Sequence, residues 1–242
     1  MKKHIIKEDS KGILTVTLNR LDKKNAITPS MYQELIDCFI YASQSEHIRC
    51  LLIKGSIDCF SAGNDFTEPA GSEPLAFKFI EILAEFDKPI VAAVAGATVG
   101  IGVTMLLHCD MVIASTGTKF RMPFANLGVS PEGASSALLA NAVGPKVANE
   151  LLLTGRFFSA EEASLWGLVN QVSEKGEALA VAQGTAKQLL KQPLPSLIAT
   201  KAELRKYLPY NVSNVVEEEL KTFVSLLESK ETQARINAMV NR

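Results

Sequence analysis

The residues best suited to chemistry stand where a buried stretch gives way to closely spaced glycines. Residues 89–94 are almost wholly apolar, and Gly96, Gly100 and Gly102 follow, the last two within or beside a predicted helix over about 101–108. Such an apolar run predicts a strand with both faces covered. Because glycines permit close backbone approach and the first amides of a helix have no partner within it, this turn could hold an electron-rich oxygen. Close packing without a ligand explains the same spacing and is its more frequent meaning.

These glycines do not match two common phosphate-binding motifs. The dinucleotide fingerprint orders its glycines as Gly-x-Gly-x-x-Gly, whereas this chain has Gly-x-x-x-Gly-x-Gly. A P-loop requires Gly-Lys-Ser/Thr, which does not follow here. The spacing therefore excludes both motifs.

A carboxylate stands in a second candidate segment, the sequence SPEG at residues 130–133. Ser130 followed by Pro131 predicts a helix over about 131–142, with Glu132 in its first turn. An acidic side chain there complements the helix dipole without any role in chemistry, which is the usual interpretation. Burial would raise the pKa of Glu132 and a helix N-terminus would lower it, and the sequence does not fix the balance.

The composition is that of an ordinary globular protein and argues against several functional classes. The 242 residues suffice for one large domain, and 25 basic against 26 acidic residues predict no general nucleic-acid surface. The four cysteines and three histidines are too scattered for zinc-ligand spacing or a disulfide framework, so we expect no metal site. Without a membrane-length apolar run or a secretory signal, the expected location is cytoplasmic, with no membrane partner.

The elements that must position these residues recur as strand, turn and helix, at residues 50–86 and again at 87–110. This recurrence predicts stacked β–β–α turns in an α/β protein and argues against an open Rossmann sheet. Residues 116–133 are expected to be irregular, and everything after about residue 190 to be helical. The other predicted strands lie at about 4–8, 12–19, 110–115 and 168–172. The predicted helices outside the second repeat lie at about 29–44 (capped by Thr28 or Ser30), 73–86 (in the first repeat), 145–153, 159–166 (with a Ser159–Glu162 capping box), 176–191, 194–207, 212–228 and 230–241.

Several motifs in this order resemble those of the crotonase, or enoyl-CoA hydratase/isomerase, superfamily. They are SAGNDF (61–66), AGATVGIGVTMLLHCD (95–110) and PFANLGVSPEGASS (123–136), together with LTVTLNR (14–20), NAIT (25–28) and TGRFFSAEEASLWGLVNQV (154–172). The resemblance covers nearly the whole chain. It implies a stacked ββα spiral over residues 1–190, which binds acyl-CoA, and a helical trimerisation region over residues 191–242.

The resemblance also implies a site. The backbone amides of Asn64 and Ile101 match the family's oxyanion hole, and no cofactor is expected, because coenzyme A is part of the substrate. The expected partners are an acyl-CoA thioester and two further copies of the chain, or five in a dimer of trimers. Asp65 is expected to brace its turn more than to act directly. The residues expected to contact substrate or coenzyme A are Lys24, Ala26, Ala62, Gly63, Asp65, Phe66, Gly100 and Phe124, and Phe77 and Phe120 are expected either in an acyl pocket or in the core.

The acids distinguish between the activities of the family. Thr104 and Phe124 occupy the positions of the two glutamates that hydratases use, and neither can transfer a proton there. Glu132 matches the single glutamate of the 3-enoyl to 2-enoyl-CoA isomerases, which suits a reaction that moves one proton from C2 to C4. A hydratase or another enolate-based activity, and a non-catalytic acyl-CoA binder, are the alternatives. Many members of the family continue past the equivalent of Arg242 with a basic, phenylalanine-containing tail that touches coenzyme A. This chain stops before that tail, so the resemblance does not assign those contacts here.

Overall fold

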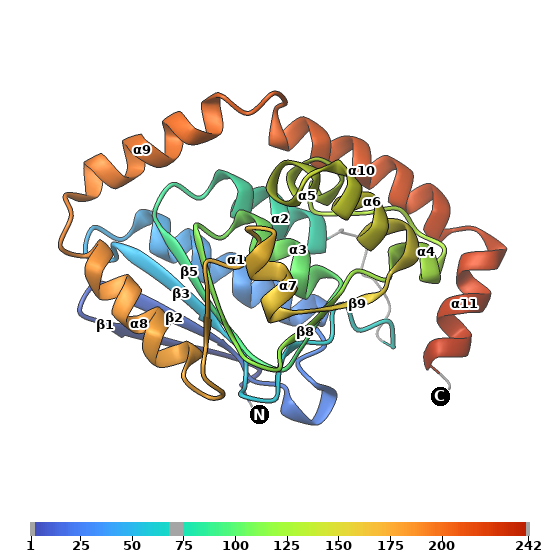
Figure 1. Cartoon of the computed structure of the whole chain (residues 1–242), viewed down its shortest axis with the longest axis horizontal. Helices are drawn as coiled ribbons and strands as arrows, with labels where there is room; N and C mark the ends of the chain where they lie inside the picture. The colour runs from blue at the N-terminus through green and yellow to red at the C-terminus, as the bar shows by residue number, and fades with distance from the viewer. Residues whose placement is uncertain (1–2, 68–74, 241–242) are drawn as a thin grey trace.

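The computed structural model describes residues 3–67 and 75–240 and builds them around two β-sheets (Figure 1). The larger sheet has the order β1-β2-β3-β5-β7-β10, and the smaller has the order β4-β6-β8-β9. The strands of the larger sheet are β1 (Ile5–Ser10), β2 (Ile13–Leu18), β3 (Cys50–Lys54), β5 (Ile90–Val94), β7 (Met111–Ser115) and β10 (Gln171–Ser173). Those of the smaller sheet are β4 (Cys59–Ser61), β6 (Ala97–Val99), β8 (Lys119–Arg121) and β9 (Phe157–Ser159).

Successive turns of the chain repeat one unit. Strand β3 enters the larger sheet, β4 enters the smaller one, and helix α2 (Leu75–Glu85) follows. The next turns repeat this with β5, β6 and α3 (Ile101–Thr104), and then with β7, β8 and α4 (Phe124–Leu127). The strands β3, β5 and β7 pair in parallel, as do β4, β6 and β8. This arrangement confirms the stacked ββα spiral predicted from the sequence.

The central strand β5 is covered on both faces, as its apolar run predicted. Ile90, Ala92 and Val94 face the main core, which is shared with helices α1 (Pro29–Gln44) and α2. Val91 and Ala93 face the opposite side, where α8 (Ala178–Leu189) packs its small side chains against the sheet. The alternation of successive side chains along a strand thus divides one apolar run between two cores.

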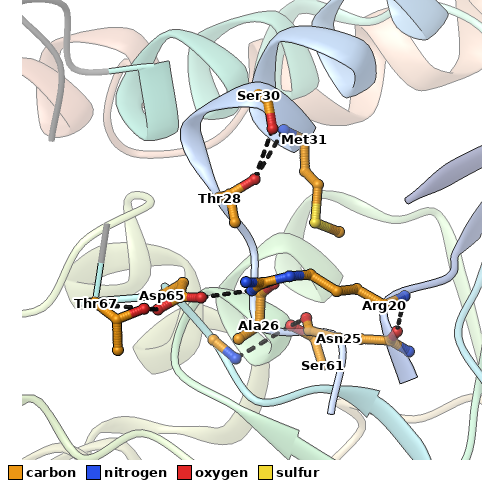
Figure 2. Close-up of polar contacts among 10 residues, drawn as sticks. Arg20, Asn25, Ala26, Thr28, Ser30, Met31, Ser61, Asp65 and Thr67 are labelled. Carbon is orange, nitrogen blue, oxygen red and sulfur yellow. Dashed lines mark hydrogen bonds and ion pairs between the residues drawn. The ribbon is translucent and has the colours of Figure 1, made fainter. Parts of the chain in front are cut away.

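The helix starts predicted from a side-chain cap at Thr28 and at Ser159 are confirmed. The Thr28 hydroxyl accepts from the Met31 amide at 3.3 Å and caps α1 (Figure 2). Ser159 and Glu162 form the predicted capping box at the start of α7 (Ala160–Leu165). Residues 101–108 are helical as predicted, although α3 tightens into the 3-10 helix η2 (Met105–His108) after Thr104.

The helical C-terminal part is confirmed, with α9 (Leu194–Lys206), α10 (Val212–Leu227) and α11 (Lys230–Val240) following α6 (Pro145–Thr154) and α8. In Figure 1 these three helices run across the top and down the right of the molecule, and α10 packs against α2. Val216 and Phe223 of α10 belong to the main core. The domain division at residue 190 and the trimer stay predictions. Among the helices described, none combines the length and apolar character that crossing a bilayer requires.

The helix predicted over 131–142 is wrong at its start. Helix α5 runs over Ser135–Val143, and residues 130–134 form a loop in which Gly133 and Ala134 have φ values of +73° and +57°. These left-handed conformations cannot continue a helix. Within the described residues the Ser130 hydroxyl has no hydrogen-bond partner, so it caps nothing. Glu132 therefore precedes the helix and does not lie in its first turn.

Two smaller predictions also need correction. The segment 116–133, expected to be irregular, contains β8 and the short helix α4. The strand expected over 168–172 is β10, at Gln171–Ser173. The helix expected from about residue 73 is described from Leu75 onward, and its predicted first residues lie outside the described part of the chain.

Candidate active site

Two loops, residues 61–65 after β4 and residues 99–102 after β6, meet with their backbones in contact. A β-carbon added to Gly63 would lie 3.0 Å from the Val99 carbonyl oxygen, and one added to Gly102 would lie 3.0 Å from the β-carbon of Ser61. Both distances are too short for a relaxed side chain. The glycine spacing therefore serves close packing, and this packing brings together the two turns expected to bind an oxygen.

The amide of Asn64 is turned away from its neighbouring segment. Ile27 and Asn64 form a parallel bridge in which the Ile27 amide donates to the Gly63 carbonyl at 2.8 Å and the Asp65 amide donates to the Ile27 carbonyl at 3.0 Å. In this pattern the intervening Asn64 N–H points to the other side. Among the described residues it has no hydrogen-bond acceptor, so it is free to bind a ligand oxygen.

The amide of Ile101 is the first of helix α3. Gly100 precedes it with φ +55° and ψ −123°, a conformation that a residue with a side chain rarely adopts. The first amides of a helix have no carbonyl within the helix to bind. The Ile101 N–H, like that of Asn64, has no acceptor among the described residues. The two adjacent loops therefore each present one free amide donor, that of Asn64 and that of Ile101, at the point where the loops meet.

These two residues line a cavity of about 80 Å³ that also contains Glu132. Because Glu132 lines the same cavity as Asn64 and Ile101, a group bound between the two amides would lie near this carboxyl group. Among the described residues that line the cavity, Glu132 carries the one carboxylate. The full lining comprises Ala62, Gly63, Asn64, Phe66, Val99, Gly100, Ile101, Pro123, Phe124, Leu127, Val129, Glu132, Phe223 and Met239.

Glu132 is almost completely buried, with 3% of its surface exposed. Its pKa is raised to about 7, mainly by burial; a hydrogen bond from Thr104 lowers the pKa in part, and the charge of the nearby Glu219 adds to the increase. The Thr104 hydroxyl donates to Glu132 Oε1 at 2.6 Å. A carboxyl group with a pKa near neutrality can both take up and release a proton at physiological pH. Of the two opposing effects on the Glu132 pKa expected from the sequence, burial therefore outweighs the helix N-terminus.

The loop that carries Glu132 is fixed at Gly133. A β-carbon on this residue would lie 3.1 Å from the Thr104 Oγ1, so only glycine allows the loop to approach Thr104 this closely. His108 Nε2 contacts the Gly133 carbonyl oxygen at 2.8 Å. Because a carbonyl only accepts, Nε2 must carry the proton. Burial lowers the His108 pKa to about 4, so the ring is neutral at physiological pH.

A buried ion pair between Arg20 and Asp65 braces the loop of residues 61–65, which carries Asn64 (Figure 2). The Arg20 guanidinium contacts Asp65 Oδ2 at 2.5 Å and donates to the Ala26 carbonyl at 3.1 Å. Thr67 donates to Asp65 Oδ1 through its amide and its hydroxyl. These donors lower the Asp65 pKa despite the opposing effect of burial. With both its oxygens engaged in this way, Asp65 has the bracing geometry expected of it.

Asn25 and Ser61 extend this brace into the backbone. The Asn25 side chain accepts from the Arg20 amide at 2.8 Å and donates to the carbonyl of Cys59 at 3.0 Å. Ser61 Oγ donates to the Asn25 carbonyl at 2.9 Å and accepts from the Gly63 amide at 3.1 Å. The loop containing Asn64 is thus joined to the segment 20–27 by a continuous set of hydrogen bonds, part of which is visible in Figure 2.

The structure brings most of the predicted site residues together. Eight line the cavity, namely Ala62, Gly63, Asn64, Phe66, Gly100, Ile101, Phe124 and Glu132. Lys24 and Ala26 lie outside it. The Lys24 carbonyl accepts from the Ala62 amide at 2.9 Å, and the Ala26 carbonyl accepts from Arg20. Lys24 and Ala26 therefore belong to the segment that supports the site. The remaining aromatic candidates, Phe77 and Phe120, belong to the main hydrophobic core and are not among the described residues that line the cavity.

Sequence reasoning missed the residues that hold the site from a distance. Thr104 was considered only as a missing acid, yet it is the hydrogen-bond donor to Glu132. The buried Tyr32 donates its phenol proton to the Asn64 side chain, and its pKa is raised by burial and by Glu132. His108 and Glu219 bind the loop after Glu132. Nothing in the spacing of these four residues marks them, because their contacts join distant parts of the chain.

Comparison with known proteins places this geometry in context. A family model described as enoyl-CoA hydratase/isomerase matches residues 8–242. The 1,2-epoxyphenylacetyl-CoA isomerase of Escherichia coli (strain K12) is 34% identical over 205 residues, which cover 80% of this chain and 78% of the relative. Enoyl-CoA delta isomerase 2 of Rattus norvegicus is 35% identical over 251 residues. That match covers 99% of this chain and 64% of the relative, so the chain spans just under two thirds of its length. The solved structure of OdaA from Pseudomonas aeruginosa superposes with a TM-score of 0.93 at 35% identity and full coverage of both chains.

Proposed function

Because the chain belongs to the enoyl-CoA hydratase/isomerase family, whose members act on acyl-CoA thioesters, we propose that it moves the double bond of a 3-enoyl-CoA to the 2 position. The single base in this reaction is Glu132. The amides of Asn64 and Ile101 hold the thioester oxygen. The name of the rat relative, an enoyl-CoA delta isomerase, agrees with this proposal.

The observation that carries the proposal is the setting of Glu132 within the cavity. It is the one carboxylate among the described lining residues, and its pKa of about 7 leaves a substantial ionised fraction at neutral pH. A thioester α-proton is weakly acidic, so its removal needs stabilisation of the developing oxyanion. Two fixed amides supply this, since one such donor contributes about 3–4 kcal/mol in measured oxyanion holes.

The proposed reaction has two proton transfers. The Glu132 carboxylate removes a proton from C2, and the electron pair moves into the thioester carbonyl to give a dienolate whose oxygen accepts from the two amides. The dienolate then collapses to form the C2–C3 double bond while C4 takes the proton back from Glu132. Thr104, which donates to Oε1, holds the carboxyl group in one orientation and leaves Oε2 for the proton.

Hydration is less well supported by the same residues. Adding water across a double bond in this family uses two acids, and the positions that match them hold Thr104 and Phe124. Both side chains are buried at the site, Thr104 against Glu132 and Phe124 in the cavity wall. A threonine hydroxyl and a phenyl ring cannot act as general acid or base at neutral pH.

The test is turnover of a purified 3-enoyl-CoA, followed by the absorbance of the conjugated 2-enoyl thioester. Glu132→Gln should lower kcat by at least about 100-fold, within the range that a positioned acid–base group contributes. Glu161→Gln, which removes a carboxylate from the exposed start of α7, is the matched control and should turn over normally. Undiminished turnover by Glu132→Gln would show that another group is the base. Formation of a 3-hydroxyacyl-CoA from a 2-enoyl-CoA would instead identify a hydratase.

A further inference from the structure

Glu219 on α10 binds the segment that carries Glu132, although 87 positions separate the two in sequence. Its Oε2 accepts from the Ala134 amide at 2.7 Å, and its Oε1 accepts from the Ser136 amide at 2.9 Å. Only 7% of the Glu219 surface is exposed. One carboxylate therefore satisfies two amides at the start of α5, which have no acceptor within that helix.

One of the two bound residues, Ala134, has an unfavourable backbone conformation. Ala134 has φ +57°, a left-handed conformation that is unfavourable for a residue with a side chain. It lies two residues after Glu132, and the Ser135 amide donates to the Glu132 carbonyl at 3.2 Å. Loss of the Glu219 contacts would let this turn relax and move the Glu132 side chain with it.

We propose that Glu219 is a positioning residue, which holds Glu132 over the cavity by binding the amides of Ala134 and Ser136. The C-terminal helix α10 thereby takes part in arranging the base. This inference rests on the proposed role of Glu132 as the base. It assigns to Glu219 no contact with substrate.

The charge of Glu219 has a second consequence, because it lies near another carboxyl. Among the described residues, titratable groups face Glu132 or its loop from three elements: Tyr32 of α1, His108 of η2 and Glu219 of α10. The phenol and the neutral imidazole carry no charge at physiological pH. The buried residues of α2 and α3 are apolar apart from Thr104. Glu219 is therefore the one charged group that acts on Glu132 from these elements, and it favours the protonated form.

Two substitutions separate the geometric effect from the charge. Glu219→Gln removes the charge and turns an NH₂ group toward one of the two amides. Glu219→Asp keeps the charge but shortens the reach, so that both hydrogen bonds cannot form at once. The control is Glu217→Gln, which makes the same change of charge on the exposed side of α10.

The experiment measures kcat and KM for a 3-enoyl-CoA and, on the same proteins, the titration of Glu132 by ¹³C NMR of the labelled carboxyl group, assigned by its loss in Glu132→Gln. We expect Glu219→Gln to lower kcat about 10-fold or more with KM changed less than about twofold. We also expect it to move the Glu132 midpoint at least about half a pH unit lower. Glu219→Asp should lower kcat while keeping the wild-type midpoint, and Glu217→Gln should match the wild type in every respect.

The proposal fails if Glu219→Gln, once folded, keeps kcat within twofold of the wild type. It also fails if kcat falls but the Glu132 midpoint stays in place, because a general loss of structure would explain that result. A wild type that does not isomerise 3-enoyl-CoA would refute the proposed function alone. In that case deuterium exchange from solvent at C2 of a bound acyl-CoA, which any enolate chemistry at this site shares, replaces kcat as the measure of Glu132 placement.

Discussion

Removing the Thr104 hydroxyl should move the pH dependence of the enzyme in a direction fixed by the geometry. This hydroxyl donates to Glu132 Oε1 at 2.6 Å, and both side chains are buried. A donor to a carboxylate stabilises the ionised form, so Thr104→Val should raise the Glu132 pKa above its value of about 7. Valine keeps the branched shape at this fully buried position and removes only the hydrogen bond.

The size of the shift follows from the strength of the bond. A hydrogen bond to a charged group contributes about 1.5–3 kcal/mol, and one pKa unit corresponds to about 1.36 kcal/mol, so the pKa should rise by about 1–2 units. Glu132 would then be ionised to about a tenth or a hundredth at pH 7, in place of about a half. kcat/KM at pH 7 should therefore fall about 5- to 50-fold and recover as the pH rises through the new pKa.

The assay is the pH profile of kcat/KM for a 3-enoyl-CoA, which reports the ionisation of the free enzyme. Thr104→Ser is the matched control, because it keeps the hydroxyl and should keep the wild-type midpoint. If Thr104→Val shows the acidic limb of the wild type, or a limb moved to lower pH, then Glu132 is not the ionising base or the Thr104 hydroxyl does not stabilise its charge.

Three further predictions concern the rest of the site. Ile101→Pro removes one oxyanion donor at the first position of α3, where proline suits the helix, and should lower kcat about 100- to 1,000-fold. The control Ile101→Val keeps the amide, and its kcat should stay within about threefold of the wild type. Equal kcat values for the two variants would contradict the oxyanion role. Glu132→Gln should be more stable than the wild type by roughly 3 kcal/mol above pH 7, because the pKa of Glu132 is 4.5 in the unfolded chain and about 7 in the folded protein. The wild type loses this amount of stability as the pH rises from about 4.5 through 7. Urea unfolding should therefore show no difference between the two proteins below about pH 4.5. Asp65→Asn removes the charge on the carboxyl group that contacts the Arg20 guanidinium, and should lower the free energy of unfolding by about 2 kcal/mol in the same assay and raise KM. An unchanged unfolding midpoint would mean that the Arg20–Asp65 contact does not brace the loops.

The fold was predictable because its main elements are specified locally. The apolar run at 90–94, the cap at Thr28 and the box at Ser159 each act within a few residues, and each appears in the structure as predicted. The short strands β6, β8 and β9 carry only three residues each and were not predicted. Their pairing depends on neighbours that are distant in sequence, and three residues show no periodicity.

The loop around Glu132 shows where local reasoning fails. Ser130 and Pro131 form a strong helix start, but Gly133 and Ala134 adopt left-handed conformations, and α5 begins only at Ser135. The amides at this start are bound by Glu219, which no short-range pattern connects to them. Glu132 could be identified as a candidate from its motif, whereas its pKa depends on burial and on partners that only the folded chain brings together.

The fate of the transferred proton distinguishes a single base that serves both carbons from two separate proton-transfer groups. A 3-enoyl-CoA that carries deuterium at C2 is converted in ordinary water, and the product is analysed by mass spectrometry and NMR for deuterium at C4. Since Glu132 is almost fully buried and is the one carboxylate among the described lining residues, a single group should carry the label across, and deuterium should appear at C4. A product whose C4 carries hydrogen from solvent only would contradict direct transfer by a single carboxyl group that is shielded from solvent.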